Sequence, residues 1–178
     1  LRNIGIDGPY DVTGVSETPS RARIFTCRPT EADEETDEDE LSCAREILLG
    51  LARRAFRRPV TSEDIVNIMA LFASGRDGAD FDAGIRTALQ AILADPEFIF
   101  RFERTPDDIP PGTNYPVTDL ELASRLSFFL WSSGPDDELI TVASEGKLRE
   151  PQILEAQTRR LLQDPRAFSL ATNFASHW

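Results

Sequence analysis

Apolar residues recur at the spacing of α-helices from residue 41 to the end of the chain. Ala44, Leu48 and Ala52 share one face of a helix that ends before Pro59, because proline disfavours helical backbone in the residue preceding it. Glycines, prolines and capping residues divide the rest of the pattern, with Thr61 as an N-cap and Thr118 with Glu121 as a capping box. They predict further helical segments over 62–74, 81–92, 97–103, 120–131, 135–143, 151–162 and 165–178. The sequence therefore predicts a mainly α fold, a multi-helix orthogonal bundle of about seven helices.

The first 30 residues show a different pattern. Short β-prone stretches around Ile4, Ile6 and Ile24 alternate weakly and are interrupted by glycines and prolines, as strands are. They favour the end of a preceding β domain or an extended lead-in. The predicted organisation is a β-like or extended segment (1–30), an acidic linker (31–40) and a helical domain (41–178), the last with candidate subdomains 41–104 and 115–178.

The linker, EADEETDEDE, holds eight carboxylates and no cation. Such a run repels itself and stays extended and solvated, which favours a spacer. A calcium site is the alternative, since calcium prefers several oxygen ligands, although the run lacks the ligand spacing and the glycine of an EF-hand loop. Partner binding is a further alternative.

The 178 residues include 31 acidic and 19 basic ones, and the formal net charge is −12. This balance argues against nucleic acid or an anionic membrane surface as the main partner. No apolar run approaches the roughly 20 residues that cross a bilayer. Because the chain begins with Leu1, shows no signal-peptide pattern and stops at Trp178 within a helical pattern, we expect a piece of a longer polypeptide.

The two cysteines, Cys27 and Cys43, have neither the spacing of a zinc ribbon nor that of a covalent haem attachment motif. In an oxidising compartment they would form a disulfide, worth roughly 3 kcal/mol in the chain-entropy model. In the cytosol they would be buried thiols. The hydrophilic segment between them cannot order itself by burial, which favours the disulfide.

Four arginines, Arg53, Arg54, Arg57 and Arg58, lie in the last turns of the helix predicted over 41–56. Like charges four residues apart repel each other unless an anion lies between them, although the helix C-terminus favours cations. Arginine is also suited to bidentate binding of carboxylate or phosphate groups. Two interpretations follow: salt bridges to the chain's own acids, such as Glu63, Asp64 or the linker, or a docking site for a ligand anion or partner.

His177 is the only histidine and Met69 the only methionine. Together they offer the ligand types of an axial haem pair, and His177 is the one candidate for cofactor binding. Met69, however, lies on an apolar helical face, which favours a core position, and a structural histidine is the alternative for His177. Because no nucleophilic triad, phosphate loop or HExxH motif is present, we predict no catalytic residue, no metal site and no cofactor bound by this segment.

The phrases ARRAFRRPVT and ELASRLSFFLW, within a stretch from Cys43 to Trp178, resemble the helical domains of unknown function that are called planctomycete cytochrome-C-associated domains. The upstream TPSRARIFTC is similar to the segment that precedes those helices. The resemblance implies an exported, multidomain protein with a c-type cytochrome module, and it favours the disulfide. Haem c would be bound elsewhere in the polypeptide. His177 stands where the family is expected to have glutamine, so the resemblance gives it no ligand role.

We therefore expect a helical module of a periplasmic or extracellular, cytochrome-linked protein that supports electron transfer or oxidoreductase activity. The alternative is a structural or assembly scaffold without catalysis. A hydrolase that acts on polysaccharide through paired carboxylates is a third hypothesis. The expected partners are other domains of the same polypeptide or subunits of an extracytoplasmic complex, with no nucleic acid and no membrane span. The link to electron transfer rests on analogy at the level of the family.

Overall fold

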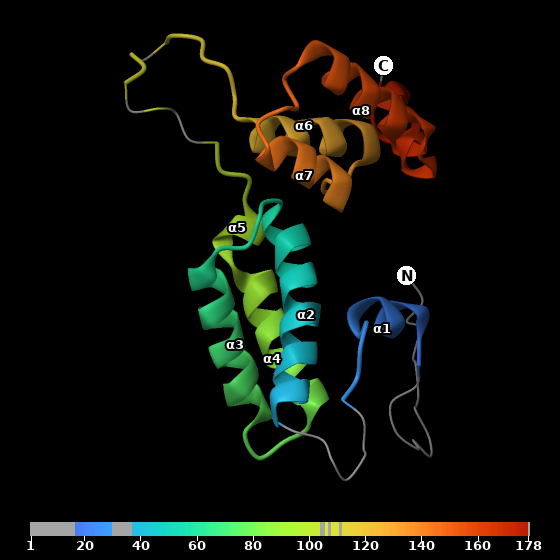
Figure 1. Ribbon diagram of the computed structural model, residues 1–178. Helices are drawn as coiled ribbons and strands as arrows, with labels where there is room; N and C mark the ends of the chain where they lie inside the picture. Colours follow the sequence, from blue (N-terminus) through green and yellow to red (C-terminus); the bar gives the residue numbers. More distant parts are fainter. Residues whose placement is uncertain (1–16, 30–36, 104–105, 107, 111, 178) are drawn as a thin grey trace, which may run out of the picture.

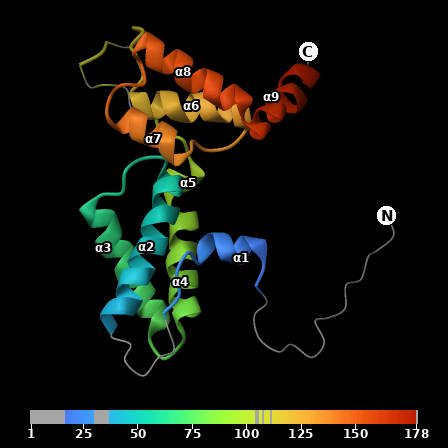
Figure 2. The same ribbon diagram turned by 45° about the vertical axis from the view of Figure 1, so that its right-hand side comes forward.

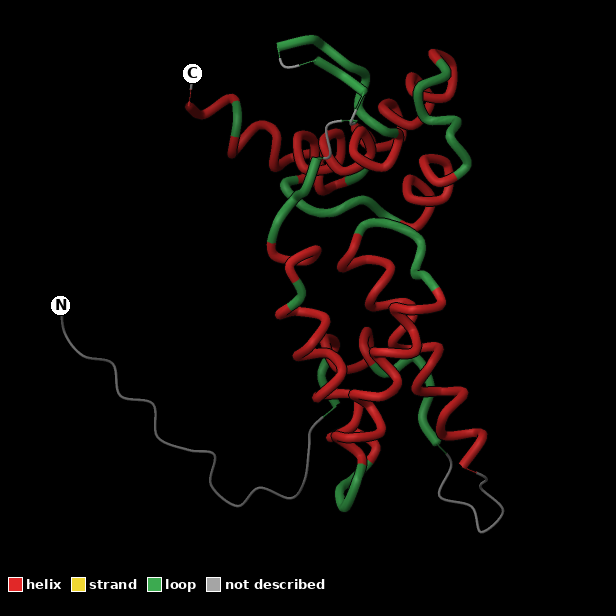
Figure 3. Tube along the Cα trace, turned by 90° about the vertical axis from the view of Figure 1, so that its left-hand side faces the viewer, coloured by secondary structure: helices red, strands yellow, loops and turns green. Residues whose placement is uncertain are grey.

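The computed structural model describes residues 17–29, 37–103, 106, 108–110 and 112–177 (Figure 1). These ranges contain helices and loops but no strand, as Figure 3 shows, so the prediction of a mainly α fold is confirmed. The helices are α1 (Pro19–Ile24), α2 (Asp37–Phe56), α3 (Ser62–Arg76), α4 (Phe81–Ala94), α5 (Pro96–Ile99), α6 (Asp119–Trp131), α7 (Asp137–Ser144), α8 (Pro151–Gln163) and α9 (Phe168–Asn173), with short 3-10 helices η1 (Pro165–Ala167) and η2 (Ala175–His177).

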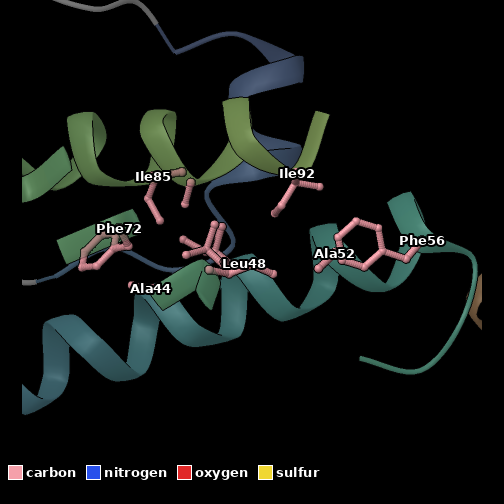
Figure 4. Packing of buried hydrophobic residues seen from close by; sticks show 10 residues of the cluster. Ala44, Leu48, Ala52, Phe56, Phe72, Ile85 and Ile92 are labelled. Carbon is pink, nitrogen blue, oxygen red and sulfur yellow. The ribbon is translucent and has the colours of Figure 1, made fainter. Parts of the chain in front are cut away.

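The first group of helices, α2, α3 and α4, lies side by side around one core (Figures 1 and 2). The predicted face of α2, with Ala44, Leu48 and Ala52, is fully buried, and Figure 4 shows it directed at the apolar side chains of α4. Gly84 of α4 allows a close approach to α3, because a Cβ there would lie 2.7 Å from the Phe72 ring. Helix packing of this kind is the main source of stability for helices of this length.

The second group, α6 to α9, surrounds a separate core to which α6 contributes most. Trp131 of α6 is buried, and its indole N–H donates to the Leu161 carbonyl oxygen at 2.8 Å. Asp119, at the start of α6, is also buried, and it accepts a hydrogen bond from the Leu148 backbone N–H at 2.7 Å. In Figures 1 and 2, α6 and α7 lie across the end of the first group, close to the C-terminus of α2, and α8 lies beyond them.

Local capping fixes most helix starts as the sequence predicts. Thr61 and Thr118 each form a reciprocal capping box, with Asp64 and Glu121 respectively, which satisfies backbone donors at the helix N-terminus. The last predicted segment, 165–178, is divided into η1, α9 and η2 instead of forming one helix.

The strand-like interpretation of the segment around Ile24 is wrong, because residues 19–24 form helix α1. Thr18 is its N-cap and accepts a hydrogen bond from the Arg21 backbone N–H at 3.1 Å, and Pro19 occupies the first helical turn. The β-prone side chains are used in tertiary packing, since Ile24 and Phe25 contact the first core. The β-like expectation for residues 1–16 lies outside the described residues.

The start of α2 also differs from the prediction. The helix begins at Asp37 and not at residue 41, so the last four residues of the predicted linker form its first turn. Carboxylates near a helix N-terminus are favoured by the helix dipole, and Glu40 forms an ion pair with Arg76, 2.6 Å from Oε1 to Nε. Residues 31–36, to which the spacer and calcium alternatives mainly refer, lie outside the described residues.

A disulfide joins Cys27 to Cys43, as favoured from the sequence. It attaches the segment after α1 to the second turn of α2, with the two Cα atoms 5.8 Å apart. Both cysteines contact the first core. In the part of the chain that the structure describes, no helix is long and apolar enough to cross a bilayer.

Candidate functional site

The arginine cluster lies where the two groups of helices meet. Arg53 donates to the Thr141 hydroxyl at 2.7 Å and to the Asp137 carbonyl oxygen at 3.2 Å. Arg54 reaches the Asp137 carboxylate at 3.2 Å. These two arginines therefore connect the C-terminal part of α2 to α7.

Arg57 binds backbone oxygens instead of a carboxylate. Its guanidinium donates to the carbonyl groups at and after the end of α5, those of Glu97, Phe98 and Phe100, which have no partner within a helix. Burial lowers the pKa of Arg57, as does the nearby Arg101, while Glu97 opposes this change. Arg57 has a positive φ of 56°, so the backbone is held in a left-handed conformation that directs this side chain to α5.

Arg58 is bound by two carboxylates, those of Asp64 and Glu97, each at 2.7 Å. The hydrogen bond from Arg58 is the main reason that the pKa of Asp64 falls to about 2, with further bonds from Thr61. Asp64 is one of the partners expected from the sequence. All four arginines thus have partners within the chain, and the docking of an external anion or partner by them stays a prediction.

A cleft of about 730 Å³ opens beside this cluster. One wall comes from the end of α2, the start of α3 and residues 97–103, and the other wall comes from the first two turns of α6. Phe56, Phe100 and Phe102 provide apolar surface, while Ser124 of α6 lines the opposite side. A cavity of this size, between two structural units and with mixed polar and apolar walls, is typical of ligand sites.

Arg101 stands out among the charged residues of this cleft. Its guanidinium lies over the Phe128 ring, 4.8 Å from the centroid, and it forms no ion pair or hydrogen bond with any residue that the structure describes. It lines both the cleft and a shallower hollow of about 440 Å³ on the side of Phe129. Besides this stacking, its charge acts at longer range on Glu103, whose pKa it helps to lower.

Two family models match the chain. The model described as PSD5, a protein of unknown function (DUF1595), matches residues 43–103, and the model described as PSD4, a protein of unknown function (DUF1592), matches residues 117–178. The chain is similar to two domain families of unknown function. The matches confirm the resemblance at that level. A search of curated proteins and a search of solved structures each found no match.

The cleft lies between the two matched segments. The DUF1595 match contains α2 from residue 43 onward and α3 to α5, with Arg57, Phe100 and Arg101. The DUF1592 match contains α6 with Ser124 and Arg125. Each segment also contains one of the two cores. A ligand or partner in the cleft would therefore contact both segments at once.

Most carboxylates of the cleft already have partners. Glu103 binds Arg125 at 2.7 and 2.5 Å, and this hydrogen bonding lowers the pKa of Glu103. Glu121 accepts a hydrogen bond from the Thr118 backbone N–H. A general acid needs a raised pKa, whereas the pKa values of Asp64 and Glu103 are lowered. The arrangement favours binding over the acid–base chemistry of a polysaccharide hydrolase.

The two residues considered as axial haem ligands from the sequence are Met69 and His177. Met69 contacts the first core, in agreement with its apolar helical face. His177 lies in η2, and its side chain is outside the part of the chain that the structure describes, so its role in cofactor binding stays a prediction. Among the described residues, no group of three or more histidine, cysteine or acidic side chains is placed to hold a metal ion.

Sequence reasoning missed Arg101 and its neighbours. The available signal was the segment EFIFRFE, in which exposed phenylalanines surround a single arginine. This segment was interpreted as a short helix, but α5 ends at Ile99 because Phe100 adopts an extended backbone conformation. Phe100 and Phe102 then pair with each other, 5.8 Å between ring centroids.

Proposed function

We propose that this chain is a docking module of an exported, c-type-cytochrome-linked multidomain protein, in which it holds a neighbouring domain in position for electron transfer. The observation that supports docking is an exposed aromatic face, which we define as Phe100, Phe102, Phe129 and Phe174. Exposed apolar clusters of this kind mark interaction surfaces in soluble proteins.

The aromatic face has the composition of an interface centre. Its four rings are between 47% and 58% exposed. They form two contacting pairs, Phe100 with Phe102 and Phe129 with Phe174, the latter 5.5 Å apart. Arg101 lines the cleft together with Phe100 and Phe102, and it lines the hollow together with Phe129. Aromatic residues and arginine carry most of the binding energy in protein interfaces.

Two further observations fit this proposal. The Cys27–Cys43 disulfide is compatible with an extracytoplasmic location, where such bonds persist. The partnered carboxylates and arginines of the cleft favour a binding role over catalysis. The cytochrome link itself is carried by the family resemblance.

A scaffold without redox function is the second candidate. It is favoured by the way in which the two cores are connected, since Arg53 and Arg54 join α2 to α7 through polar contacts. Such a junction places two separately packed units at a defined position, as a scaffold requires. The same aromatic face would then serve assembly only.

The test uses the full-length gene product that contains this chain. The double variant Phe129→Ser and Phe174→Ser removes two anchoring rings and should expose the neighbouring domain. A protease should then cleave that domain at least about fivefold faster than in the wild-type protein. Val66→Ser, at a site that is 66% exposed on α3, is the matched control and should change nothing. Charge reversal at Arg53 and Arg57 is unsuitable, because both side chains bond within the chain.

A visible spectrum of the same preparations separates the two candidates. A Soret band, together with slower haem reduction in the double variant, supports the electron-transfer role. Faster proteolysis without any Soret band leaves only the scaffold. Unchanged proteolysis in the double variant contradicts docking by this face, and with it both candidates.

A further inference from the structure

We propose that the cleft between the two matched segments binds a small organic anion, a carboxylate joined to a flat apolar body. Arg101 would bind the carboxylate, and Phe100 and Phe102 would contact the apolar part. This inference does not rest on the proposed docking function. Phe100 and Phe102 belong both to the cleft and to the aromatic face, but Phe129 and Phe174, which the docking test changes, do not line the cleft.

The negative charge of the proposed ligand is inferred from the guanidinium of Arg101. Five carboxylates that could pair with Arg101 line the cleft, those of Glu63, Asp64, Glu97, Glu103 and Glu121. Four of these carboxylates are already engaged by an arginine or a helix cap, and Glu63, on the first turn of α3, forms no ion pair with any described residue. Arg101 forms no ion pair or hydrogen bond with a carboxylate in the described part of the chain, and its charge acts on Glu103 only at longer range, where it contributes to the lowered pKa of Glu103. A planar, bidentate anion fits such a group.

The surroundings of Arg101 strengthen the case for an anion. Its stacking on Phe128 holds the guanidinium in place, which reduces the entropy that binding would cost. Arg57 lines the same cleft, and the charge of Arg101 contributes to the lowered pKa of Arg57. An anion at this position relieves the repulsion between the two cations.

The flat apolar part of the proposed ligand is inferred from the rings of Phe100 and Phe102. Phe100 and Phe102 are 57% and 58% exposed although they line a cavity, and their planes are tilted by 52°. A flat ligand can stack on one ring and meet the edge of the other, the geometry that aromatic pairs prefer. The volume of about 730 Å³ lies within the range of small-molecule sites.

The opposite wall offers a hydrogen-bonding group without a partner. The Ser124 hydroxyl oxygen is buried and makes no hydrogen bond with any described residue, and Ser124 lines the cleft from α6. Buried polar atoms are rarely left unsatisfied. A carboxylate oxygen that accepts from Ser124 would satisfy this atom and would connect the two walls.

The test uses three probes of nearly the same shape: 2-naphthylacetate, its neutral amide and 2-(2-naphthyl)ethylammonium. Binding to the 178-residue chain is followed by NMR titration. With about 14 non-hydrogen atoms, the acid should bind with a Kd of order 1 mM. The amide should bind about five- to tenfold more weakly, because it forms no charge-assisted bond, and the cation should bind more weakly still. Added salt should weaken only the binding of the acid.

Variants locate the site. Arg101→Gln should weaken binding of the acid about tenfold and leave the amide unchanged. Ser124→Ala should weaken the acid by a few-fold. Arg86→Gln, at an exposed arginine on α4, is the matched control and should have no effect. Circular dichroism checks that each variant is folded.

Several outcomes would overturn the inference. One is equal affinity for the acid and the amide, which would mean that Arg101 does not recognise charge. Another is no binding of the acid at about ten times the expected Kd. A third is binding that Arg101→Gln leaves unchanged, or NMR shifts confined to residues outside the cleft. None of these results bears on docking through Phe129 and Phe174, which lie outside the lining of the cleft and which the full-length protein tests separately.

Discussion

Replacing Asp64 with Asn should destabilise the protein only where this carboxylate is ionised. The Asn side chain can still accept the capping hydrogen bond from Thr61, and Arg58 keeps its second partner, Glu97, so the change removes mainly one charge. The fall of the Asp64 pKa from 3.8 to about 2 corresponds to at most about 2.5 kcal/mol. Because the group is partly solvated, we expect a loss of about 1 to 1.5 kcal/mol at neutral pH.

The sign of the pH dependence follows from the direction of the pKa change. A carboxyl group whose pKa is lowered on folding stabilises the protein above its unfolded pKa, and this contribution is lost as the pH falls towards the folded value. The difference in free energy of unfolding between wild type and Asp64→Asn should therefore be constant above about pH 5 and should shrink between about pH 4 and pH 2.

Urea unfolding followed by circular dichroism measures this difference at each pH. Glu63→Gln is the matched control, since Glu63 lies in the same first turn of α3 without an ion-pair partner among the described residues. It should reveal the helix-dipole contribution alone, about 0.3 to 1 kcal/mol. An Asp64→Asn effect equal to that of the control, or one that persists undiminished at pH 2, would refute the assignment to the Arg58 ion pair.

Three further changes test the fold by urea unfolding. Replacing Cys27 and Cys43 with serine should lower the free energy of unfolding by about 3 kcal/mol. A reductant should have no further effect on this variant. An unchanged free energy of unfolding would contradict the disulfide. Gly84→Ala should lower the free energy of unfolding by about 1 to 3 kcal/mol, because the new Cβ would meet an aromatic ring. Gly50→Ala, with open space around it, should raise that free energy by up to about 1 kcal/mol. Equal effects of the two substitutions would contradict the close packing at Gly84. Asp119→Ala should cost about 2 to 4 kcal/mol, because it leaves a buried backbone N–H unpaired; a loss below about 1 kcal/mol would show that water replaces the carboxylate.

Features that depend on near neighbours were predictable from the sequence. The N-cap at Thr61 and the capping box of Thr118 with Glu121 need only residues three positions apart, and both form as expected. The reciprocal bond from Asp64 that completes a capping box at Thr61 was not predicted. The apolar face of α2 follows in the same way from helical periodicity. The disulfide was also favoured correctly, although its two cysteines are 16 residues apart, because the segment between them has few apolar residues.

Features that depend on tertiary contacts were not predictable. Ile24 and Phe25 have strand propensity, but their helix is fixed by the Thr18 cap and by packing on the first core, and tertiary packing commonly overrides such propensities. Asp137, a partner of two arginines of the cluster, lies more than 80 residues away in the sequence. The exposure of Arg101 depends on the path of residues 100–103, which follow α5 on the way to α6, and no periodicity encodes that path.

Arg57 illustrates how the position of the cleft is determined. A non-glycine residue with positive φ costs of order 1 kcal/mol or more, so glycine would be the expected residue at the end of α2. Glycine, however, would lose the guanidinium that binds the carbonyl groups of Phe98 and Phe100. These bonds hold the segment that carries Phe100 and Arg101 against α2. The strained backbone at Arg57 is therefore compensated by contacts that fix one wall of the cleft, which links a local conformational cost to the geometry of the candidate site.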